Sequence, residues 1–512
     1  MDTLRMVNLK KLILINALFL LLVTAVAVAG IWLPRSLGAS GSLASASSAS
    51  PTSAAAINAF LGENPAETTQ GLKMLQSLQS AFRSVAANVL PTIVEVDVVD
   101  IVQAPSVGSG TPFDFFFGPR SNQGETPQFR QQGLGSGVIV RQDGSKVYVL
   151  TNSHVAGDAE EISVRLFDGQ QFTAKLVGSD PKKDLALVSF ESKEQLPVAE
   201  LGDSDSLMVG DWVLAVGSPL GFESTVTSGI VSAVGREAAS GSNVGSFTDY
   251  IQTDAAINQG NSGGALVNIL GEVVGLNTWI ASSSGGNIGL GFAIPINNAK
   301  KAINDIITKG RSEYGWLGIS MGSLSLPSAR DLSLENAKGA FVYGVFEKSP
   351  ADAAGVLPGD FVTSVNATAV KDGSDLLKLV SNLEPGSRVK FGVIRNGEAL
   401  ELSARITARN DESIAASSSA LWPGFALAPL TDDIRAQLNI SSNAGDLVIV
   451  NVEQGSPAQI AGLSQGDVVR KLNGNQVETL ADFYRIFNDT KSREIMFNIT
   501  RQSTDLVIGL VR

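Results

Sequence analysis

Ser262 lies in the glycine-rich segment 259–264, which reads QGNSGG, and this setting can make a serine hydroxyl reactive. A serine is a weak nucleophile until a neighbouring base takes its proton. Glycines beside it let the backbone turn tightly, so that peptide N–H groups can point at a developing oxyanion. Serine among glycines is also a common turn sequence. The segment therefore needs partners elsewhere in the chain before it indicates catalysis.

The chain contains one histidine, His154, in the segment VLTNSHV, 108 residues before Ser262. The serine segment also fits the G-x-S-x-G pattern of α/β-hydrolases, but in that fold the histidine follows the serine. Asp184, in DPKKDLALV, lies between the two. Taken singly, His154 fits a surface or core residue and Asp184 a turn residue. Their order, His then Asp then Ser, is the order of the chymotrypsin-like catalytic triad.

Short apolar strands with glycine-rich turns surround these residues, and they include TIVEVDVV, SGVIV, KVYVLTN, DWVLAVG and EVVGLNT. Strands at this spacing predict an all-β sandwich or barrel. We expect a helix before the strands, at about 72–89, and another after them, at Asn297–Lys309. Further on, Ser349–Asn366 matches Ser456–Asn473 at a constant offset of 107 residues. This internal repeat predicts two homologous α+β domains.

The N-terminus carries Arg5, Lys10 and Lys11, followed by an uncharged run of 22 residues at 12–33. Such a run is about long enough to span a bilayer, and the positive flank places the rest of the chain on the far side. The alternative is a signal peptide cleaved after Ala29, within an A-x-A site. We expect the helix to be retained. The Ser- and Ala-rich segment that follows is typical of a flexible tether.

The whole chain has 512 residues, room for about three domains, with a formal net charge of −12 and no cysteine. Nucleic-acid binding depends on neutralising phosphates, so this charge argues against such a partner. The absence of cysteine excludes disulfides, a thiol nucleophile and a cysteine zinc site.

The chain resembles the HtrA/Deg family of serine proteases in the segments TNSHV, DLALV, TDAAINQGNSGGALVN and GGNIGLGFAIP, and in the two C-terminal repeats. The resemblance implies a mainly β fold, a chymotrypsin-like double β-barrel followed by two PDZ-like α+β domains. The expected division is a cytoplasmic N-terminus at 1–11, a transmembrane helix at 12–33, a linker at 34–70, a protease domain at 71–309, and PDZ domains at 313–408 and 421–512.

The same resemblance implies the roles of the site residues. Ser262 would attack the scissile carbonyl, His154 would transfer its proton, and Asp184 would orient the imidazole. The N–H groups of Gly260 and Ser262 would form the oxyanion hole, with Asn261 shaping the turn. No metal or organic cofactor is implied.

The primary substrate pocket is expected to be apolar. Ala256 lies six residues before the serine, where trypsin-like enzymes that cut after Lys or Arg carry an acid, and Ile257 follows it. These residues predict a pocket for a small or medium aliphatic side chain. Trp279 lies in the segment that should wall the pocket, where its bulk would shrink or reshape it.

The segment 314–319, YGWLGI, resembles the carboxylate-binding loop of PDZ domains. Backbone N–H groups of Leu317, Gly318 and Ile319 would hold the C-terminus of a peptide that adds as a strand to the sheet edge. The equivalent segment of the second repeat, 423–427, matches less well, and a structural spacer stays an alternative for that copy.

A polar insertion at 102–133 contains four phenylalanines, Phe113, Phe115, Phe116 and Phe117. They are expected to be covered, either by their own domain or by neighbouring subunits. Since proteases of this family form trimers and larger cages, we expect a homotrimer or a multiple of trimers.

The expected function is a serine endoprotease of the cell envelope that degrades unfolded or mislocalised proteins, with PDZ domains that bind peptide C-termini. Two alternatives remain, a regulatory protease that cuts one membrane signalling protein, and a chaperone or binding module with secondary proteolysis. The expected location is the bacterial inner membrane, single-pass, with the protease facing the periplasm or the exterior. A protein cleaved after Ala29 would instead be soluble in the periplasm.

Overall fold

The computed structural model describes residues 65–102, 129–157, 159–218, 224–237, 247–282, 286–411, 418–438, 440, 445–489 and 493–512. The helix expected at 12–33, most of the tether and the four phenylalanines at 113–117 lie outside these residues. Among the helices of the described residues, none is long and apolar enough to cross a membrane. The chain divides into two units, Met1–Gln76 and Ser77–Arg512, and the domains described below belong to the second.

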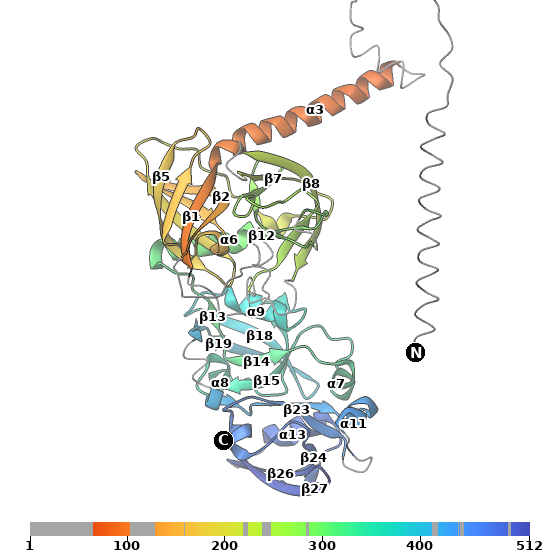
Figure 1. The fold of residues 1–512 in the computed structure, drawn as a ribbon. Coiled ribbons are helices and arrows are strands. Elements are labelled where there is room, and N and C mark those ends of the chain that lie inside the picture. The colour runs from red at the N-terminus through yellow and green to blue at the C-terminus, as the bar shows by residue number, and fades with distance from the viewer. Residues whose placement is uncertain are drawn as a thin grey trace, which may run out of the picture. The chain divides into compact units, whose positions relative to one another are not determined.

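The region that contains His154, Asp184 and Ser262 consists of two closed six-stranded barrels (Figure 1). The first has the strand order β1-β2-β3-β6-β5-β4 and the second the order β10-β11-β12-β9-β8-β7. This confirms the predicted double barrel. The strands of the first barrel are β1 (Ile93–Val102), β2 (Phe129–Asp143), β3 (Lys146–Thr151), β4 (Glu161–Arg165), β5 (Gln171–Asp180) and β6 (Leu185–Glu191). Those of the second are β7 (Trp212–Gly217), β8 (Thr225–Arg236), β9 (Tyr250–Thr253), β10 (Ala265–Asn268), β11 (Val273–Ile280) and β12 (Gly291–Pro295).

Strand β3 shows why the barrels pack together. Its residues alternate between two faces, as in any β-strand. Val147 and Val149 belong to the core cluster of the first barrel, whereas Tyr148 and Leu150 belong to a cluster shared by both barrels. All four side chains are buried. Strands that are apolar on both faces therefore fill a barrel and cover its junction with the next one, and the candidate triad lies along this junction.

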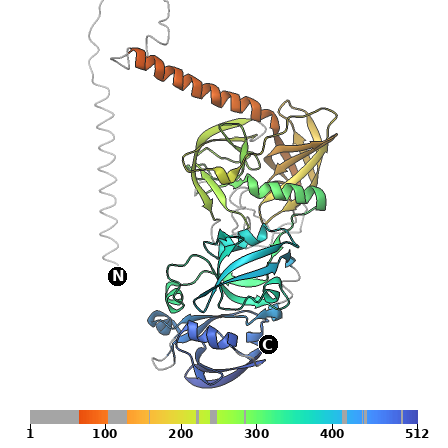
Figure 2. The same ribbon diagram turned by 180° about the vertical axis from the view of Figure 1, so that it is seen from behind.

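Helices close the junction from outside the barrels. The helix predicted at Asn297–Lys309 is present as α6 (Ile296–Lys309). It contacts strands of both barrels (Figure 2). Gly310, with a φ of 75°, ends it in the left-handed conformation typical of a helix C-cap. The end of α3 (Pro65–Val89) adds Val85 and Val89 to the shared cluster. Short helical turns complete this region, η1 (Leu90–Thr92), α5 (Ser153–Ala156) and η2 (Ser204–Ser206).

The two halves of the internal repeat fold as two similar domains, the first repeat domain and the second repeat domain. The first contains β13 (Gly315–Trp316), β14 (Ile319–Gly322), α7 (Leu326–Asp331), β15 (Ala340–Phe346), α8 (Pro350–Ala353), β16 (Phe361–Val365), β17 (Thr368–Ala369), α9 (Gly373–Ser381), β18 (Arg388–Arg395), β19 (Glu398–Arg405) and β20 (Thr407–Ala408). The second contains η4 (Ser418–Ala420), β21 (Leu421–Trp422), β22 (Phe425–Pro429), α11 (Asp432–Leu438), β23 (Leu447–Val452), α12 (Pro457–Ala461), β24 (Val468–Leu472), β25 (Asn475–Gln476), α13 (Leu480–Asp489), β26 (Glu494–Arg501) and β27 (Thr504–Val511).

The repeat extends to a buried ion pair. Asp360 is fully buried and accepts from Arg395 Nε at 2.6 Å, and its counterpart Asp467 accepts from Arg501 Nε at the same distance. The main sheets also match, with the orders β14-β15-β16-β18-β19 and β22-β23-β24-β26-β27. The predicted homology of the two domains is therefore present in topology and in side-chain pairing.

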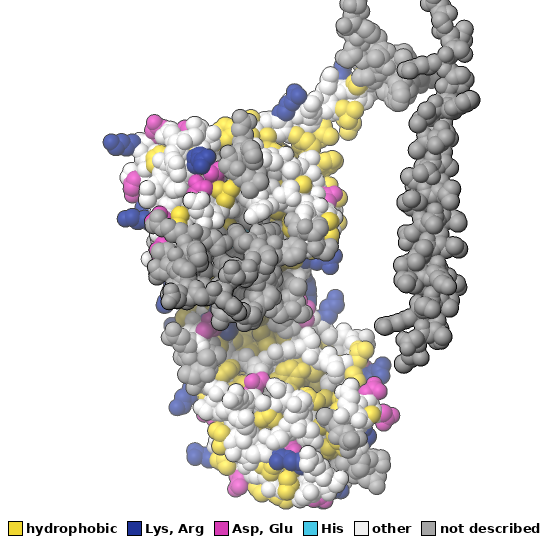
Figure 3. Space-filling view, in the orientation of Figure 1, with side chains coloured by type: hydrophobic (Ala, Val, Ile, Leu, Met, Phe, Trp, Pro, Cys, Tyr) yellow, Lys and Arg dark blue, Asp and Glu magenta, His cyan; other side chains and the backbone are white. Residues whose placement is uncertain are grey.

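The two repeat domains are joined by main-chain and side-chain contacts. β21 pairs with β15 of the first repeat domain, so one short strand from each side of the boundary forms a common ladder. Phe341 of the first repeat domain lies 5.5 Å from the ring centroid of Tyr484 of the second. On the face drawn in Figure 3, acidic and basic side chains of the described residues are interspersed, a pattern that keeps a surface soluble.

Candidate active site

His154 is presented by the chain reversal that follows β3. The strand ends at Thr151, and the single-turn helix α5 begins at Ser153 and carries the histidine in its first turn. α5 contacts strands β1 and β6 of the same barrel. The backbone around His154 is thus held by the barrel wall, while its side chain is partly buried, with 18% exposed.

Asp184 ends the turn between β5 and β6, at the entry to a buried strand. Its φ of 55° is left-handed, which is uncommon and costly for a residue with a Cβ. The side chain of Asn152 supports it, because Nδ2 donates to the Asp184 carbonyl at 3.0 Å. Asp184 is 2% exposed.

The Asp184 carboxylate accepts hydrogen bonds from three groups, and this fixes its orientation. His154 Nδ1 lies 2.9 Å from Oδ2, and the His154 backbone N–H donates to Oδ1 at 3.1 Å. Thr278 Oγ1 of the second barrel donates to Oδ2 at 2.7 Å. A buried carboxylate with this many donors stays in place and holds the imidazole through Nδ1.

Ser262 lies in a turn before β10 in which a side chain larger than glycine would clash with neighbouring atoms. Gly263 has a φ of 84°, and a Cβ there would approach the Ser136 carbonyl oxygen to 2.1 Å. Ser136, a buried residue of β2, binds this turn from the other barrel. Its N–H donates to the Ser262 carbonyl at 2.8 Å, and its Oγ donates to the Gly260 carbonyl at 2.6 Å. The serine of the second barrel is thereby attached to the first.

The Ser262 hydroxyl donates to the Thr278 carbonyl at 2.8 Å. Thr278 therefore contacts Asp184 through its side chain and Ser262 through its main chain. Within the described residues, the N–H groups of Gly260 and Ser262 donate no hydrogen bond, whereas the N–H of Asn261 donates to the Asn258 carbonyl. Two N–H groups beside a serine hydroxyl are the components of an oxyanion site.

Of the three residues expected at the substrate pocket, Ala256 is half-buried, whereas Ile257 and Trp279 pack against other side chains. Ala256 is half-buried, and its carbonyl accepts from Thr227 Oγ1 at 2.8 Å. Ile257 is 1% exposed and belongs to the core of the second barrel. Trp279 stacks on Phe292 with ring centroids 3.9 Å apart. The side chains of Ile257 and Trp279 are thus engaged in packing.

Tyr250 lies edge-on to Trp279, with ring centroids 5.5 Å apart. Burial raises the pKa of the Tyr250 hydroxyl, and the negative charge of Asp184 raises it further. This tyrosine stays neutral beside the triad.

The predicted carboxylate loop of the first repeat domain connects β13 to β14, at an edge of the sheet. Leu317 is buried, Gly318 has a φ of 86°, and Ile319 begins β14. The Gly318 carbonyl accepts from the Phe346 N–H at 2.9 Å. In the second repeat domain, the Gly424 carbonyl accepts from the Glu453 N–H at 2.8 Å in the same way.

Sequence reasoning did not identify Ser136, Thr278 or Asn152 as site residues. Ser136 is 124 positions from the glycine whose carbonyl it binds, and Thr278 is 94 positions from Asp184. Asn152 lies within the TNSHV segment, but its amide acts on a carbonyl 32 residues away. Residue type carries no signal for such contacts, because small polar residues occupy many turns.

The chain is similar to known proteins over most of its length. Residues 135–276 match the trypsin-like peptidase domain model, and residues 315–406 and 424–509 match the PDZ domain model. The chain is 36% identical over 445 residues to a probable periplasmic serine endoprotease DegP-like of Chlamydia trachomatis, covering 84% of this chain and 88% of the relative. It is 40% identical over 400 residues to the periplasmic pH-dependent serine endoprotease DegQ of Escherichia coli, covering 78% and 84%.

Among solved structures, the HtrA-type protease AlgW with decapeptide is 38% identical, with a TM-score of 0.51. The match covers 64% of this chain and 98% of that one.

Proposed function

Because the chain belongs to the HtrA/Deg family of serine endoproteases with two PDZ domains, we propose that His154, Asp184 and Ser262 are its catalytic triad. The observation that carries the proposal is the 2.9 Å contact between His154 Nδ1 and the buried Asp184 carboxylate. Thr278 links this pair to Ser262 across the junction of the barrels.

In the proposed reaction, Ser262 Oγ attacks the carbonyl carbon of the scissile peptide bond while His154 Nε2 takes its proton. His154 then gives that proton to the leaving amine, and water completes hydrolysis by the same route. Asp184 stabilises the imidazolium through Nδ1 without being protonated. The hydroxyl that now donates to Thr278 would rotate toward His154 before attack, and rotation of a serine side chain is rapid.

The N–H groups of Gly260 and Ser262 would stabilise the negative oxygen of the tetrahedral intermediate. Hydrogen-bond donors aimed at such an oxygen supply a large part of catalysis in serine proteases. Asn261 lies between them, 2% exposed, and anchors the turn through its own N–H.

Ala256 and the packing of Trp279 favour cleavage after small or medium aliphatic residues. One experiment tests this and the triad together. Casein is digested by wild-type protein and by the Ser262→Ala and His154→Ala variants, and the cut positions are identified by mass spectrometry. We expect both variants to lose several orders of magnitude in rate, and cuts to follow Val, Ala or Ile. Near-wild-type digestion by the folded His154→Ala protein would refute the triad, and dominant cuts after Lys or Arg would refute the apolar pocket.

The first repeat domain is the proposed receptor for peptide C-termini. Strand β14 lies at the edge of its sheet and contacts α9. A peptide could therefore pair with β14 as a further strand, between β14 and α9. Phe346, next to the loop at Gly318, is apolar and lies 5.7 Å from the ring centroid of Trp316. Apolar surroundings and backbone N–H groups suit a C-terminus with an apolar last side chain.

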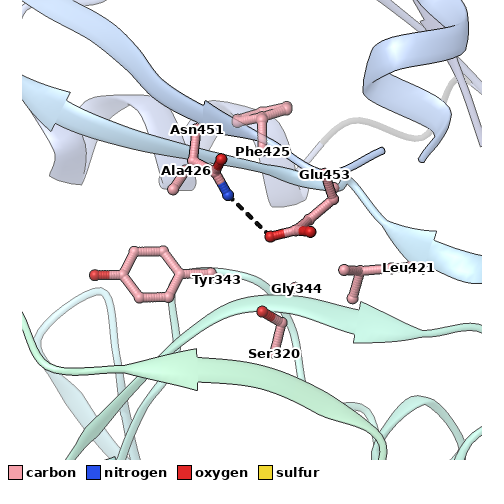
Figure 4. A pocket seen from close by; sticks show the side chains of 9 residues that line it. Ser320, Tyr343, Gly344, Leu421, Phe425, Ala426, Asn451 and Glu453 are labelled. Carbon is pink, nitrogen blue, oxygen red and sulfur yellow. Dashed lines mark hydrogen bonds between the residues drawn. The ribbon is translucent and has the colours of Figure 1, made fainter. Parts of the chain in front are cut away.

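The second repeat domain differs at the equivalent point. Where the first has Phe346, the second has Glu453, whose N–H donates to Gly424 of the corresponding loop. Asn451 Nδ2 donates to Glu453 Oε1 at 2.8 Å, and both residues line a pocket that Ser320 of the first repeat domain lines from the opposite side (Figure 4). A carboxylate at this point would repel the carboxylate of a peptide C-terminus.

A helix of the first repeat domain also covers the corresponding groove of the second. α7 contacts both β22 and α13, the two elements that would flank a bound peptide. Asp331, the last residue of α7, accepts from the Leu480 N–H at 2.6 Å, at the start of α13. These contacts favour the structural-spacer alternative for the second repeat domain.

The proposed physiological role is degradation of unfolded or mislocalised proteins in the periplasm, since the relatives are named periplasmic serine endoproteases. Anchoring to the inner membrane through 12–33 and assembly as trimers remain parts of this proposal. The regulatory-protease alternative predicts that the protein does not cleave casein but does cleave one membrane protein.

A further inference from the structure

The pocket between the two repeat domains lies beside the edge strand of the first. Ser320 of β14 and Tyr343 and Gly344 of β15 line it from the first repeat domain, and the second contributes Glu453 and Asn451, both exposed (Figure 4). The pocket has a volume of about 200 Å³. Sites for whole small molecules usually measure roughly 300–1,000 Å³. The space therefore suits a single side chain of a larger ligand.

The polar groups of this pocket can accept hydrogen bonds, and one of them is negatively charged. Within the described part of the chain, the Glu453 carboxylate accepts from Asn451 Nδ2 and forms no ion pair. Among the same residues, Asn451 Oδ1 and Ser320 Oγ accept no hydrogen bond, and none of the residues that line the pocket is basic. Lysine and arginine carry a positive charge and only donors. The polar lining is therefore complementary to an ammonium or guanidinium group.

The remaining walls of the pocket are apolar. Leu421, Phe425 and Ala426 line it on the side of the second repeat domain, and the Tyr343 ring lines it on the side of the first (Figure 4). Lysine and arginine pack their methylene groups on apolar surface while the charged end reaches polar groups. An aromatic ring also attracts a cation that lies over its face. Apolar walls with a carboxylate thus fit a long basic side chain in both its parts.

The direction of side chains on β14 shows which residues of a bound peptide would reach the pocket. Ile319 and Met321 pack against the core of the first repeat domain, which includes Leu376 of α9, whereas Ser320 between them lines the pocket. A peptide paired with β14 alternates in the same way. Its apolar last side chain, position 0, would face the core as Ile319 does. Positions −1 and −3 would then face the pocket, as Ser320 does.

We propose that this pocket recognises a Lys or Arg side chain at position −1 or −3 of the peptide that binds along β14. This inference rests on the proposed role of the first repeat domain as a receptor for peptide C-termini. The second repeat domain then adds specificity to the binding site of the first. Glu453, which disfavours a C-terminal carboxylate in its own loop, instead favours a basic residue in a peptide held next door.

The test uses full-length Ser262→Ala protein, so that the probes are not cleaved, and fluorescence anisotropy of labelled decapeptides. The parent peptide ends in three valines and a free carboxylate and has no charged side chain. Lysine and, for comparison, glutamine are placed in turn at positions −1, −2 and −3. Lysine at −1 or −3 should bind about fivefold more tightly than glutamine, between the effect of an exposed ion pair and that of a hydrogen bond to a buried charge. Lysine at −2, which faces the apolar core, should not. The preference should shrink in about 0.5 M salt.

Variants of Glu453 assign the preference to the pocket. Glu453→Gln should remove the advantage of lysine and leave the affinity for the parent peptide unchanged. Glu453→Lys should reverse the preference, so that glutamate at the same position binds better than lysine. Glu398→Gln is the matched control, because Glu398 is an exposed glutamate of β19, at the opposite edge of the same sheet. It should keep the full preference for lysine.

A preference for lysine that persists in Glu453→Gln protein would overturn the proposal. An equal advantage at −1, −2 and −3 would also overturn it, because it would show only general attraction to a chain with a net charge of −12. Equal affinity for the free and the amidated parent peptide would show that the receptor role itself is wrong, and this inference with it. A clear preference for the free carboxylate without any effect of lysine would overturn this inference alone.

Discussion

Thr278 holds two members of the proposed triad at once. Its hydroxyl donates to Asp184 Oδ2 at 2.7 Å, and its carbonyl accepts from Ser262 Oγ at 2.8 Å. Asp184 belongs to the first barrel, whereas Thr278 and Ser262 belong to the second. One residue therefore connects the carboxylate that orients the base to the nucleophile across the junction.

Thr278→Val should lower kcat about tenfold while KM changes little. The substitution keeps the shape of the side chain and removes one hydrogen bond to a charged group, a loss that is generally worth about 1.5–3 kcal/mol. Steady-state kinetics on a fluorogenic peptide measures the effect. Thr278→Ser, which keeps the hydroxyl, is the control and should stay close to wild type. Equal kcat for the valine and serine variants would contradict the role of the hydroxyl.

Lys183 is 3% exposed, and its Nζ donates to Asn382 Oδ1 at 2.8 Å. Lys183→Met should make the catalytic domain more stable at pH 7. The pKa of Lys183 is lowered by burial from 10.5 to about 8, which corresponds to a cost of about 3 kcal/mol for the charged form. The unfolded chain binds the proton more tightly than the folded one. The cost is therefore present in full below pH 8 and declines as the pH rises toward 10.5.

Melting curves of wild-type and Lys183→Met protein at pH 7 and pH 10 measure this prediction. The variant should melt several degrees higher at pH 7, and most of that difference should be gone at pH 10. Lys371→Met, at an exposed site, should show no pH-dependent difference. A variant that is less stable at both pH values would show that the hydrogen bond to Asn382 outweighs the burial of charge.

At the scale of elements, the turn before β10 needs glycine because neighbouring atoms leave no room for a Cβ, as well as because of its left-handed backbone. A Cβ on Gly263 would lie 2.1 Å from the Ser136 carbonyl oxygen and 2.4 Å from Thr151 Oγ1. Real Cβ atoms do not approach backbone so closely, so the turn would have to move away from β2. That movement would carry Ser262 with it, because Ser136 binds the Ser262 carbonyl.

Gly263→Ala should therefore abolish most activity. It should also lower the melting temperature by more than left-handed backbone strain alone would lower it. Gly169→Ala is the matched control, since Gly169 has a similar φ of 90° but no described atom within 4 Å of the position that its Cβ would take. The control should cost only the left-handed strain, about 1–2 kcal/mol. Activity and thermal unfolding measured side by side distinguish the clash from the strain. Identical effects of the two substitutions would rule out the close approach.

At the scale of the whole molecule, the two repeat domains carry the same fold but present different surfaces. Helix α7 of the first covers the space between β22 and α13 of the second, and Asn488 Nδ2 of α13 donates to the Pro358 carbonyl at 2.8 Å. The edge strand β14 of the first repeat domain contacts β15 and α9 of its own domain, and its Ser320 lines the pocket that faces the second repeat domain. The internal repeat thus accounts for the shared fold, and packing accounts for the difference between the two surfaces.

We expect one peptide to bind per chain. Isothermal titration of full-length protein with a decapeptide that ends in three valines and a free carboxylate should give a single site, and the amidated peptide should bind more weakly. Phe346→Glu, which gives the first loop the side chain of the second, should weaken binding at least tenfold by charge repulsion. Glu453→Gln is the control and should leave affinity and stoichiometry unchanged. Two sites of similar affinity would contradict the spacer role of the second repeat domain.

The sequence by itself determined the features that depend on local pattern and chain order. Short apolar strands with glycine-rich turns predicted an all-β sandwich or barrel, and the resemblance to the HtrA/Deg family predicted the double barrel. The constant offset of 107 residues predicted the paired domains. The order of His154, Asp184 and Ser262, together with the glycines around the serine, predicted the triad, because reactive residue types in a fixed order are rare by chance. A helix was also predicted at Asn297–Lys309, and it is present at Ile296–Lys309.

Only the tertiary structure decided which small polar residues support the site and which repeat domain has its β22–α13 groove covered by a helix. Ser136 and Thr278 act across the barrel junction, and Lys183 donates across a domain boundary to Asn382. Such contacts join residues that are far apart in sequence, and the same residue types are also common in surface turns. Ile257 was expected at the substrate pocket, yet its side chain lies in the barrel core. An apolar residue suits either place, and only the direction of its Cα–Cβ bond in the folded chain separates them.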